Sequence, residues 1–155
     1  MKVWMTAMMT AMMCTALAAQ AGPQVRVWKA GAILDRGKVL AGKMDAQKVA
    51  SEVVATEGNR SFMVAHREGS GLAEVHDKQA DVMVISVGEV TMVTGGTVVD
   101  GKVTAPGETR GPSIKGGTET KLGPGDVLHI PAGVAHQMKL APGAKVTYFV
   151  TKVVQ

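Results

Sequence analysis

Short stretches in which apolar and polar residues alternate occupy most of the chain after residue 22, and glycine-containing turns separate them. An alternation of period two is that of a β-strand, whose successive side chains point to opposite faces of a sheet. Turns at intervals of roughly ten residues are typical of sandwiches and barrels, so the expected class is all-β. The pattern predicts strands over residues 49–55, 61–67, 72–76, 81–87, 91–93, 127–131, 135–140 and 146–154.

Two segments depart from this pattern. Within residues 31–47 apolar side chains recur at helical spacing, which predicts a short N-terminal helix despite Gly37 and Gly42. Residues 94–122 are rich in glycine and alternate little. A stretch of that length without regular structure is usually functional, so a lid over a pocket is expected. An ordered hairpin around Thr97–Val103 without a role is the alternative.

Residues 1–21 have the composition of a secretory signal peptide. Lys2 precedes an uncharged apolar stretch, and small residues allow cleavage after Ala18 or after Ala21. We therefore expect a leader over residues 1–21 and a single domain over residues 22–155, periplasmic or secreted and free of the membrane after cleavage. An uncleaved membrane anchor is the alternative.

Composition narrows the function classes further. The chain has 155 residues, of which 46% are hydrophobic and 3% aromatic, enough for one domain with an apolar core. The formal charge of +4 comes from scattered Lys and Arg, and few aromatic rings are present for base stacking, so we expect no nucleic-acid partner. The single cysteine, Cys14, lies in the leader, so the exported chain relies on its core or on a metal for stability.

The first candidate for a chemical site contains Glu74 and His76. Residues two apart on a strand share a face, so these side chains project together. Asp81 opens the next predicted strand and can fold back beside them, which brings three ligand-type side chains to one end of a hairpin. The alternative is that all three are solvated groups near a turn.

A second candidate segment runs from Gly125 to His136. Pro131 and Gly133 predict a tight reversal, after which His136 begins the returning strand. His136 shares a face with Met138, so its imidazole would lie above an apolar floor, where a metal or substrate site gains strength from a low dielectric. A core histidine hydrogen-bonded to the backbone is the alternative.

Together the two segments resemble the motifs of the cupin superfamily, G-x5-H-x-H-x3-4-E-x6-G and G-x5-P-x-G-x2-H-x3-N. The matching positions of the first motif carry Glu74, His76, Asp81 and Gly88, and those of the second carry Gly125, Pro131, Gly133 and His136. The departures are Glu74 for His, Asp81 for Glu, Leu140 for the terminal Asn, and Gly69 one residue nearer to the first ligand position.

The resemblance implies a jelly-roll barrel in which Glu74, His76, Asp81 and His136 hold a divalent metal ion. Mixed imidazole and carboxylate donors suit Mn, Fe, Zn or Ni. With a small polar ligand, such an ion supports isomerase, lyase or dioxygenase chemistry, with Glu74 as the catalytic general base. The alternatives are a non-enzymatic small-molecule binding module, and a structural module in which residues 146–154 pair across a homodimer.

Other polar residues have less specific roles. Three basic residues are candidates to bind an anionic ligand, namely Arg67, Arg110 and Lys115. The alternative is that their side chains are only solvated at the surface. His66 ends a predicted strand. We expect it at the rim of the pocket, and a role in supporting the metal ligands or in acid–base chemistry is the alternative. His129 is expected to be a structural or pocket-wall residue.

Overall fold

The computed structural model describes residues 24–155. The predicted signal peptide, its cleavage site and Cys14 lie outside the described residues. Among the described helices, none has the length and apolar character needed to cross a membrane.

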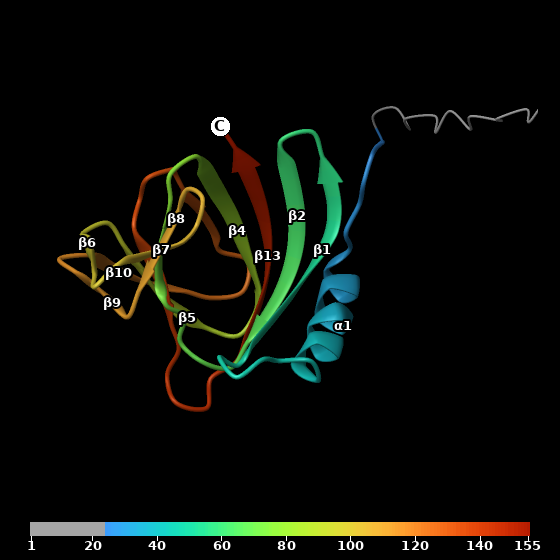
Figure 1. The fold of residues 1–155 in the computed structure, drawn as a ribbon. Coiled ribbons are helices and arrows are strands. Elements are labelled where there is room, and N and C mark those ends of the chain that lie inside the picture. Colours follow the sequence, from blue (N-terminus) through green and yellow to red (C-terminus); the bar gives the residue numbers. More distant parts are fainter. Residues whose placement is uncertain (1–23) are drawn as a thin grey trace, which may run out of the picture.

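One helix and thirteen strands make up the described chain (Figure 1). The elements are α1 (Ala30–Ala41), β1 (Val49–Glu57), β2 (Arg60–Arg67), β3 (Ala73–His76), β4 (Gln79–Val87), β5 (Val90–Thr94), β6 (Thr97–Val99), β7 (Lys102–Ala105), β8 (Glu108–Gly111), β9 (Ser113–Lys115), β10 (Thr118–Leu122), β11 (Val127–Ile130), β12 (His136–Lys139) and β13 (Val146–Val154). The eight strands predicted from alternation are all present within a few residues of their expected bounds.

The strands form two main antiparallel sheets that face each other (Figure 1). The five-stranded sheet has the order β1-β2-β13-β4-β11, and the six-stranded sheet has the order β10-β5-β12-β3-β8-β7. The predicted all-β jelly-roll class with a short N-terminal helix is therefore confirmed. The barrel is not closed, because the two sheets keep separate edges.

Side chains from both sheets fill the space between them. Along strand β13, Tyr148 and Val150 point into the core while Thr147 lies on the opposite face. Met92 and Met138 meet them from the six-stranded sheet. Strand β13 lies between β2 and β4, so both of its edges are already paired. The predicted dimer contact through residues 146–154 is therefore wrong, because a central strand leaves no edge for a partner.

Helix α1 covers the outer face of the five-stranded sheet (Figure 1). Gly37 permits this approach, because a Cβ atom there would lie 2.6 Å from the Thr147 side chain. The rings of Trp28, Phe62 and Phe149 pack beside the helix with centroids 5.0 to 6.3 Å apart. The helix predicted within residues 31–47 is thus confirmed and ends before Gly42.

Residues 94–122 are not the stretch without regular structure that the pattern predicts, and their role as a lid stays a prediction. The segment contains β6 to β10, and β6 pairs with β9 while β7 pairs with β8. The alternative hairpin around Thr97–Val103 is wrong as well, because β6 and β7 do not pair with each other. The pattern missed these strands because they are short and β7 is exposed along its whole length, so it has no buried face to produce alternation.

Candidate metal centre

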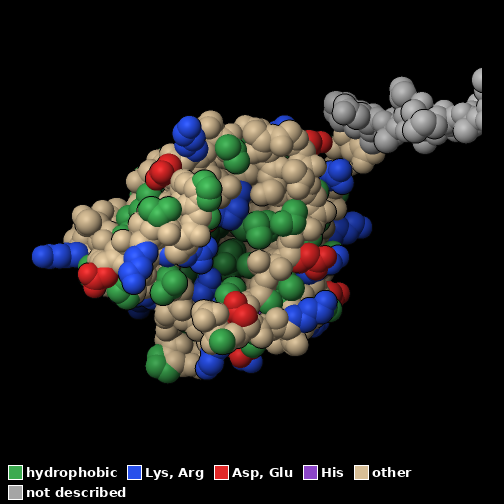
Figure 2. Space-filling view, in the orientation of Figure 1, with side chains coloured by type: hydrophobic (Ala, Val, Ile, Leu, Met, Phe, Trp, Pro, Cys, Tyr) green, Lys and Arg blue, Asp and Glu red, His purple; other side chains and the backbone are tan. Residues whose placement is uncertain are grey.

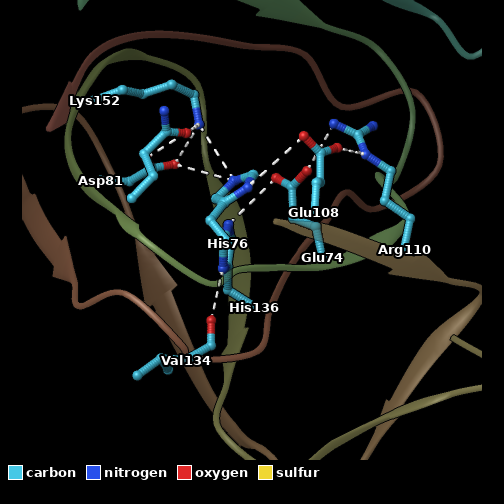
Figure 3. A network of polar contacts seen from close by, with 9 residues as sticks. Glu74, His76, Asp81, Glu108, Arg110, Val134, His136 and Lys152 are labelled. Carbon is cyan, nitrogen blue, oxygen red and sulfur yellow. Dashed lines mark hydrogen bonds and ion pairs between the residues drawn. The ribbon is translucent and has the colours of Figure 1, made fainter. Parts of the chain in front are cut away.

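The register of three neighbouring strands builds the site. In the six-stranded sheet, β3 lies between β12 and β8. Glu74 pairs with His136 on one side and with Arg110 on the other. His76 pairs with Glu108. The backbone ladder therefore gathers these five side chains on adjoining strands (Figure 3).

Glu74, His76 and His136 come together as a cluster of metal-ligand type. One ligand atom of each lies within 4.8 Å of those of the other two. The two imidazole rings lie 5.3 Å apart between centroids, and both are buried. Ligand atoms about 2.1 Å from a metal ion lie roughly 3 to 4 Å from one another. Small side-chain rotations would therefore bring the three ligand atoms within bonding distance of one ion.

One nitrogen of His136 faces the Glu74 carboxylate without a well-formed hydrogen bond. Its Nδ1 donates a hydrogen bond to the carbonyl oxygen of Val134 at 3.0 Å, which fixes the ring and directs Nε2 into the site. Nε2 lies 3.3 Å from Glu74 Oε1, yet it is buried and forms no hydrogen bond with any described residue. Buried polar atoms normally form a hydrogen bond, so the absence of one at Nε2 marks a position suited to a ligand or an ion.

Asp81, the fourth residue of the predicted ligand set, lies on the facing sheet and outside this cluster. Its carboxylate is 1% exposed and accepts hydrogen bonds from Lys152 Nζ at 2.8 and 3.1 Å. It is 3.9 Å from His76 Nε2. The structure therefore brings three of the four predicted ligands together and pairs the fourth with an ammonium group (Figure 3).

Sequence reasoning missed Lys152 and Glu108. The sequence does indicate Lys152, because it lies two and four residues after the core residues Val150 and Tyr148 and therefore on the same face of the strand. A lysine at an inward position of an apolar strand needs a counter-charge. Glu108 lies in the segment predicted as a lid, where the pattern did not show which side chains point towards the interior. Its carboxylate is paired with Arg110 and lies 3.9 Å from His76 Nδ1.

The remaining candidates are placed as follows. Lys115 is exposed on β9, and His129 is exposed on β11. His66 is buried against Thr147, its ring nitrogen 2.9 Å from the hydroxyl, on the face that α1 covers. It therefore does not reach the metal cluster, because the neighbouring Ala65 takes the inward position. Arg110 alone of the three basic candidates contacts the site, through Glu74 at 3.0 Å.

Opposite charges control the protonation of the cluster. Burial by itself raises the pKa of Glu74, but the close contact with His136 and the charges of His136, Arg110 and His76 outweigh burial and bring this pKa from 4.5 to about 2. Burial disfavours protonation of His136, yet the Glu74 carboxylate raises its pKa. Burial together with the Lys152 charge lowers the pKa of His76. Glu74 is thus a carboxylate, ready to bind a cation, throughout the neutral range.

The lowered pKa of Glu74 predicts acid sensitivity of the metal-free fold. A carboxyl whose pKa falls on folding stabilises the protein above pH 4.5, and this contribution is lost as the pH drops towards 2. We expect the difference in unfolding free energy between the parent chain and Glu74→Gln to shrink by about 3 kcal/mol across that interval. Urea unfolding in the presence of a chelator measures it, and a difference that is independent of pH would contradict the ion pair.

A pocket connects the site with solvent. It has a volume of about 480 Å³ and reaches His76 and Glu108. Figure 2 shows a hollow near the middle of the visible face of the molecule, with hydrophobic and Lys or Arg side chains on its walls. A cavity of this size accommodates a small molecule next to the cluster.

Comparison with known proteins agrees with this architecture. No protein-family model matches the chain, and no curated protein matches its sequence. A cupin 2 conserved barrel domain protein from Rhodopseudomonas palustris has a TM-score of 0.50 at 14% identity, over 69% of this chain and 61% of that chain. The cupin domain of Cnp3 from Schizosaccharomyces pombe has a TM-score of 0.53 at 11% identity, over 70% and 66%. The polyketide cyclase RemF from Streptomyces resistomycificus has a TM-score of 0.50 at 14% identity, over 70% and 67%.

These similarities establish the architecture. The chain has the fold of the cupin superfamily, as its two motifs predicted. At such low identities the likeness concerns the fold alone. The chain spans 61% and 66% of the lengths of the first two of these proteins.

Proposed function

We propose that this protein binds one divalent metal ion through Glu74, His76 and His136 and presents it to a small anionic molecule. The observation that carries the proposal is the buried Nε2 of His136, which forms no well-formed hydrogen bond and faces Glu74 at 3.3 Å, within a cluster of three convergent ligand atoms. Two imidazoles and one carboxylate suit Mn, Fe, Zn or Ni. Export to the periplasm or the exterior, predicted from residues 1–21, is part of the proposal.

Charge supports the choice of an anionic ligand. Three carboxylates, those of Glu74, Asp81 and Glu108, are paired here with two cations, Arg110 and Lys152. The group therefore carries one uncompensated negative charge while the histidines are neutral. A divalent ion turns this into one positive charge, which favours a small anion in the adjoining pocket.

The same geometry indicates the role of Glu74. A carboxylate with a pKa of about 2, held by Arg110 at 3.0 Å, is a weak base and a good cation ligand. When bound, a metal with open coordination positions supplies Lewis acidity, which suits isomerase, lyase or dioxygenase chemistry. Anchoring of Glu74 by Arg110 also favours the second candidate, a binding module without turnover. Turnover assays on the metal-loaded protein separate these two candidates.

Metal binding predicts a thermal shift. With Co²⁺ at about 100 times its Kd, we expect the metal-depleted protein to gain about 2.7 kcal/mol and roughly 8 °C in Tm. Short oxyacids and keto acids should raise the Tm further only after the metal is present, because they bind at the ion. Differential scanning calorimetry measures both steps. No shift with any of Mn²⁺, Fe²⁺, Co²⁺, Ni²⁺ or Zn²⁺ would contradict the proposed function.

A further inference from the structure

The ammonium group of Lys152 contacts Asp81 and His76, two of the four residues predicted to bind the metal. Lys152 lies on β13 directly opposite Asp81 on β4 in the strand register. Its Nζ donates hydrogen bonds to both Asp81 oxygens, at 2.8 and 3.1 Å, and to Gln79 Oε1 at 3.2 Å. A further contact of 3.3 Å joins Nζ to His76 Nε2 (Figure 3).

These contacts satisfy the ammonium group completely. It has three N–H donors, and three different residues surround it as acceptors. Asp81 is 1% exposed, so its charge needs a partner inside the protein. Lys152 therefore acts as a resident cation on the side of the site that faces away from Glu74.

The contact with His76 creates a competition. Nε2 has one lone pair in the plane of the ring, which accepts the ammonium proton or binds a metal ion but cannot do both. Asp81 is subject to the same choice, because its two oxygens are hydrogen-bonded to Lys152. An ammonium and a divalent ion in such close proximity also repel each other.

We infer that Lys152 is the residue that limits the metal site to three protein ligands and lowers its affinity, by occupying Asp81 and competing for His76. This inference deepens the proposed function and rests on the same site. Lys152 thus determines the affinity and the number of ligands of the site, since a neutral residue there frees Asp81 to become the fourth ligand.

Titration calorimetry with Co²⁺ tests the inference on the full exported chain. Lys152→Met, which keeps length without charge, is expected to bind Co²⁺ at least about tenfold more tightly than the parent. Lys152→Arg, the charge-preserving control, should not bind more tightly. Adding Asp81→Asn to Lys152→Met should remove the part of the gain that comes from Asp81 and leave only the part that comes from His76. The visible absorption of the bound Co²⁺ should change in Lys152→Met and return towards the parent spectrum in the double variant.

The outcomes distinguish this inference from the proposed function. If the parent binds Co²⁺ and a folded Lys152→Met binds it no better, the inference fails and the function stands. If Lys152→Met binds Co²⁺ through Asp81 and the parent binds none, the inference stands and the function fails. If neither binds, both fail. Should Lys152→Met not fold, Lys152→Gln takes its place in the comparison, because it also removes the ammonium charge that repels a metal ion.

Discussion

Replacement of His136 by alanine is expected to abolish stoichiometric metal binding, with the affinity for Co²⁺ falling by more than about 100-fold. Loss of a residue that only supports a metal ligand costs about 10 to 100-fold, and His136 is proposed as a ligand itself. Its ring is already oriented by Val134, and its Nε2 has no competing hydrogen bond among the described residues. Metal analysis after desalting, together with calorimetry, measures the loss.

His129→Ala is the matched control for this experiment. His129 is exposed on β11 and takes no part in the cluster. Its removal changes the histidine content of the chain by the same amount and should leave metal content and affinity unchanged. Equal losses in both variants, or full metal content in a folded His136→Ala protein, would contradict the assignment of His136.

Gly88→Ala is expected to destabilise the fold by more than about 4 kcal/mol. Gly88 has a φ angle of +86°, which side-chain-bearing residues rarely adopt. A Cβ atom there would also lie 1.9 Å from the carbonyl oxygen of Lys145, and that neighbour is backbone rather than a flexible side chain. Denaturation in urea should show a large fall in the midpoint or no folded protein at all.

Gly123→Ala provides the comparison. No atom lies within 4 Å of a Cβ built at Gly123. We expect its unfolding free energy to stay within about 0.5 kcal/mol of the parent. If Gly88→Ala proves as mild as Gly123→Ala, the close approach of β4 and β13 at this turn is not present in solution.

Local sequence information was sufficient for the strands that bury one face. Val146–Val154 is rich in β-branched and aromatic residues and is found at the predicted bounds, because its inward residues pack between two sheets. The strand β7, Lys102–Ala105, has no buried side chain and therefore no hydrophobic period to detect. Its partner β8 was missed with it, and so the segment that carries Glu108 was predicted to lack regular structure.

The site was predictable only in part, for a related reason. Spacing within each segment placed Glu74 beside His76, but only the register between β3 and β12 places His136 opposite Glu74. The ion pair of Asp81 with Lys152 depends on residues separated by 71 positions in the chain. Pairing at such distances is set by sheet topology, which the pattern of a single strand does not contain.

X-ray absorption at the cobalt edge is the most direct measurement of whether Glu74, His76 and His136 surround one ion. For the Co²⁺-loaded protein we expect two imidazole groups and carboxylate oxygen in the inner shell, with one imidazole lost in any cobalt retained by His136→Ala. A spectrum without imidazole scattering, or one that His136→Ala leaves unchanged, would contradict this coordination.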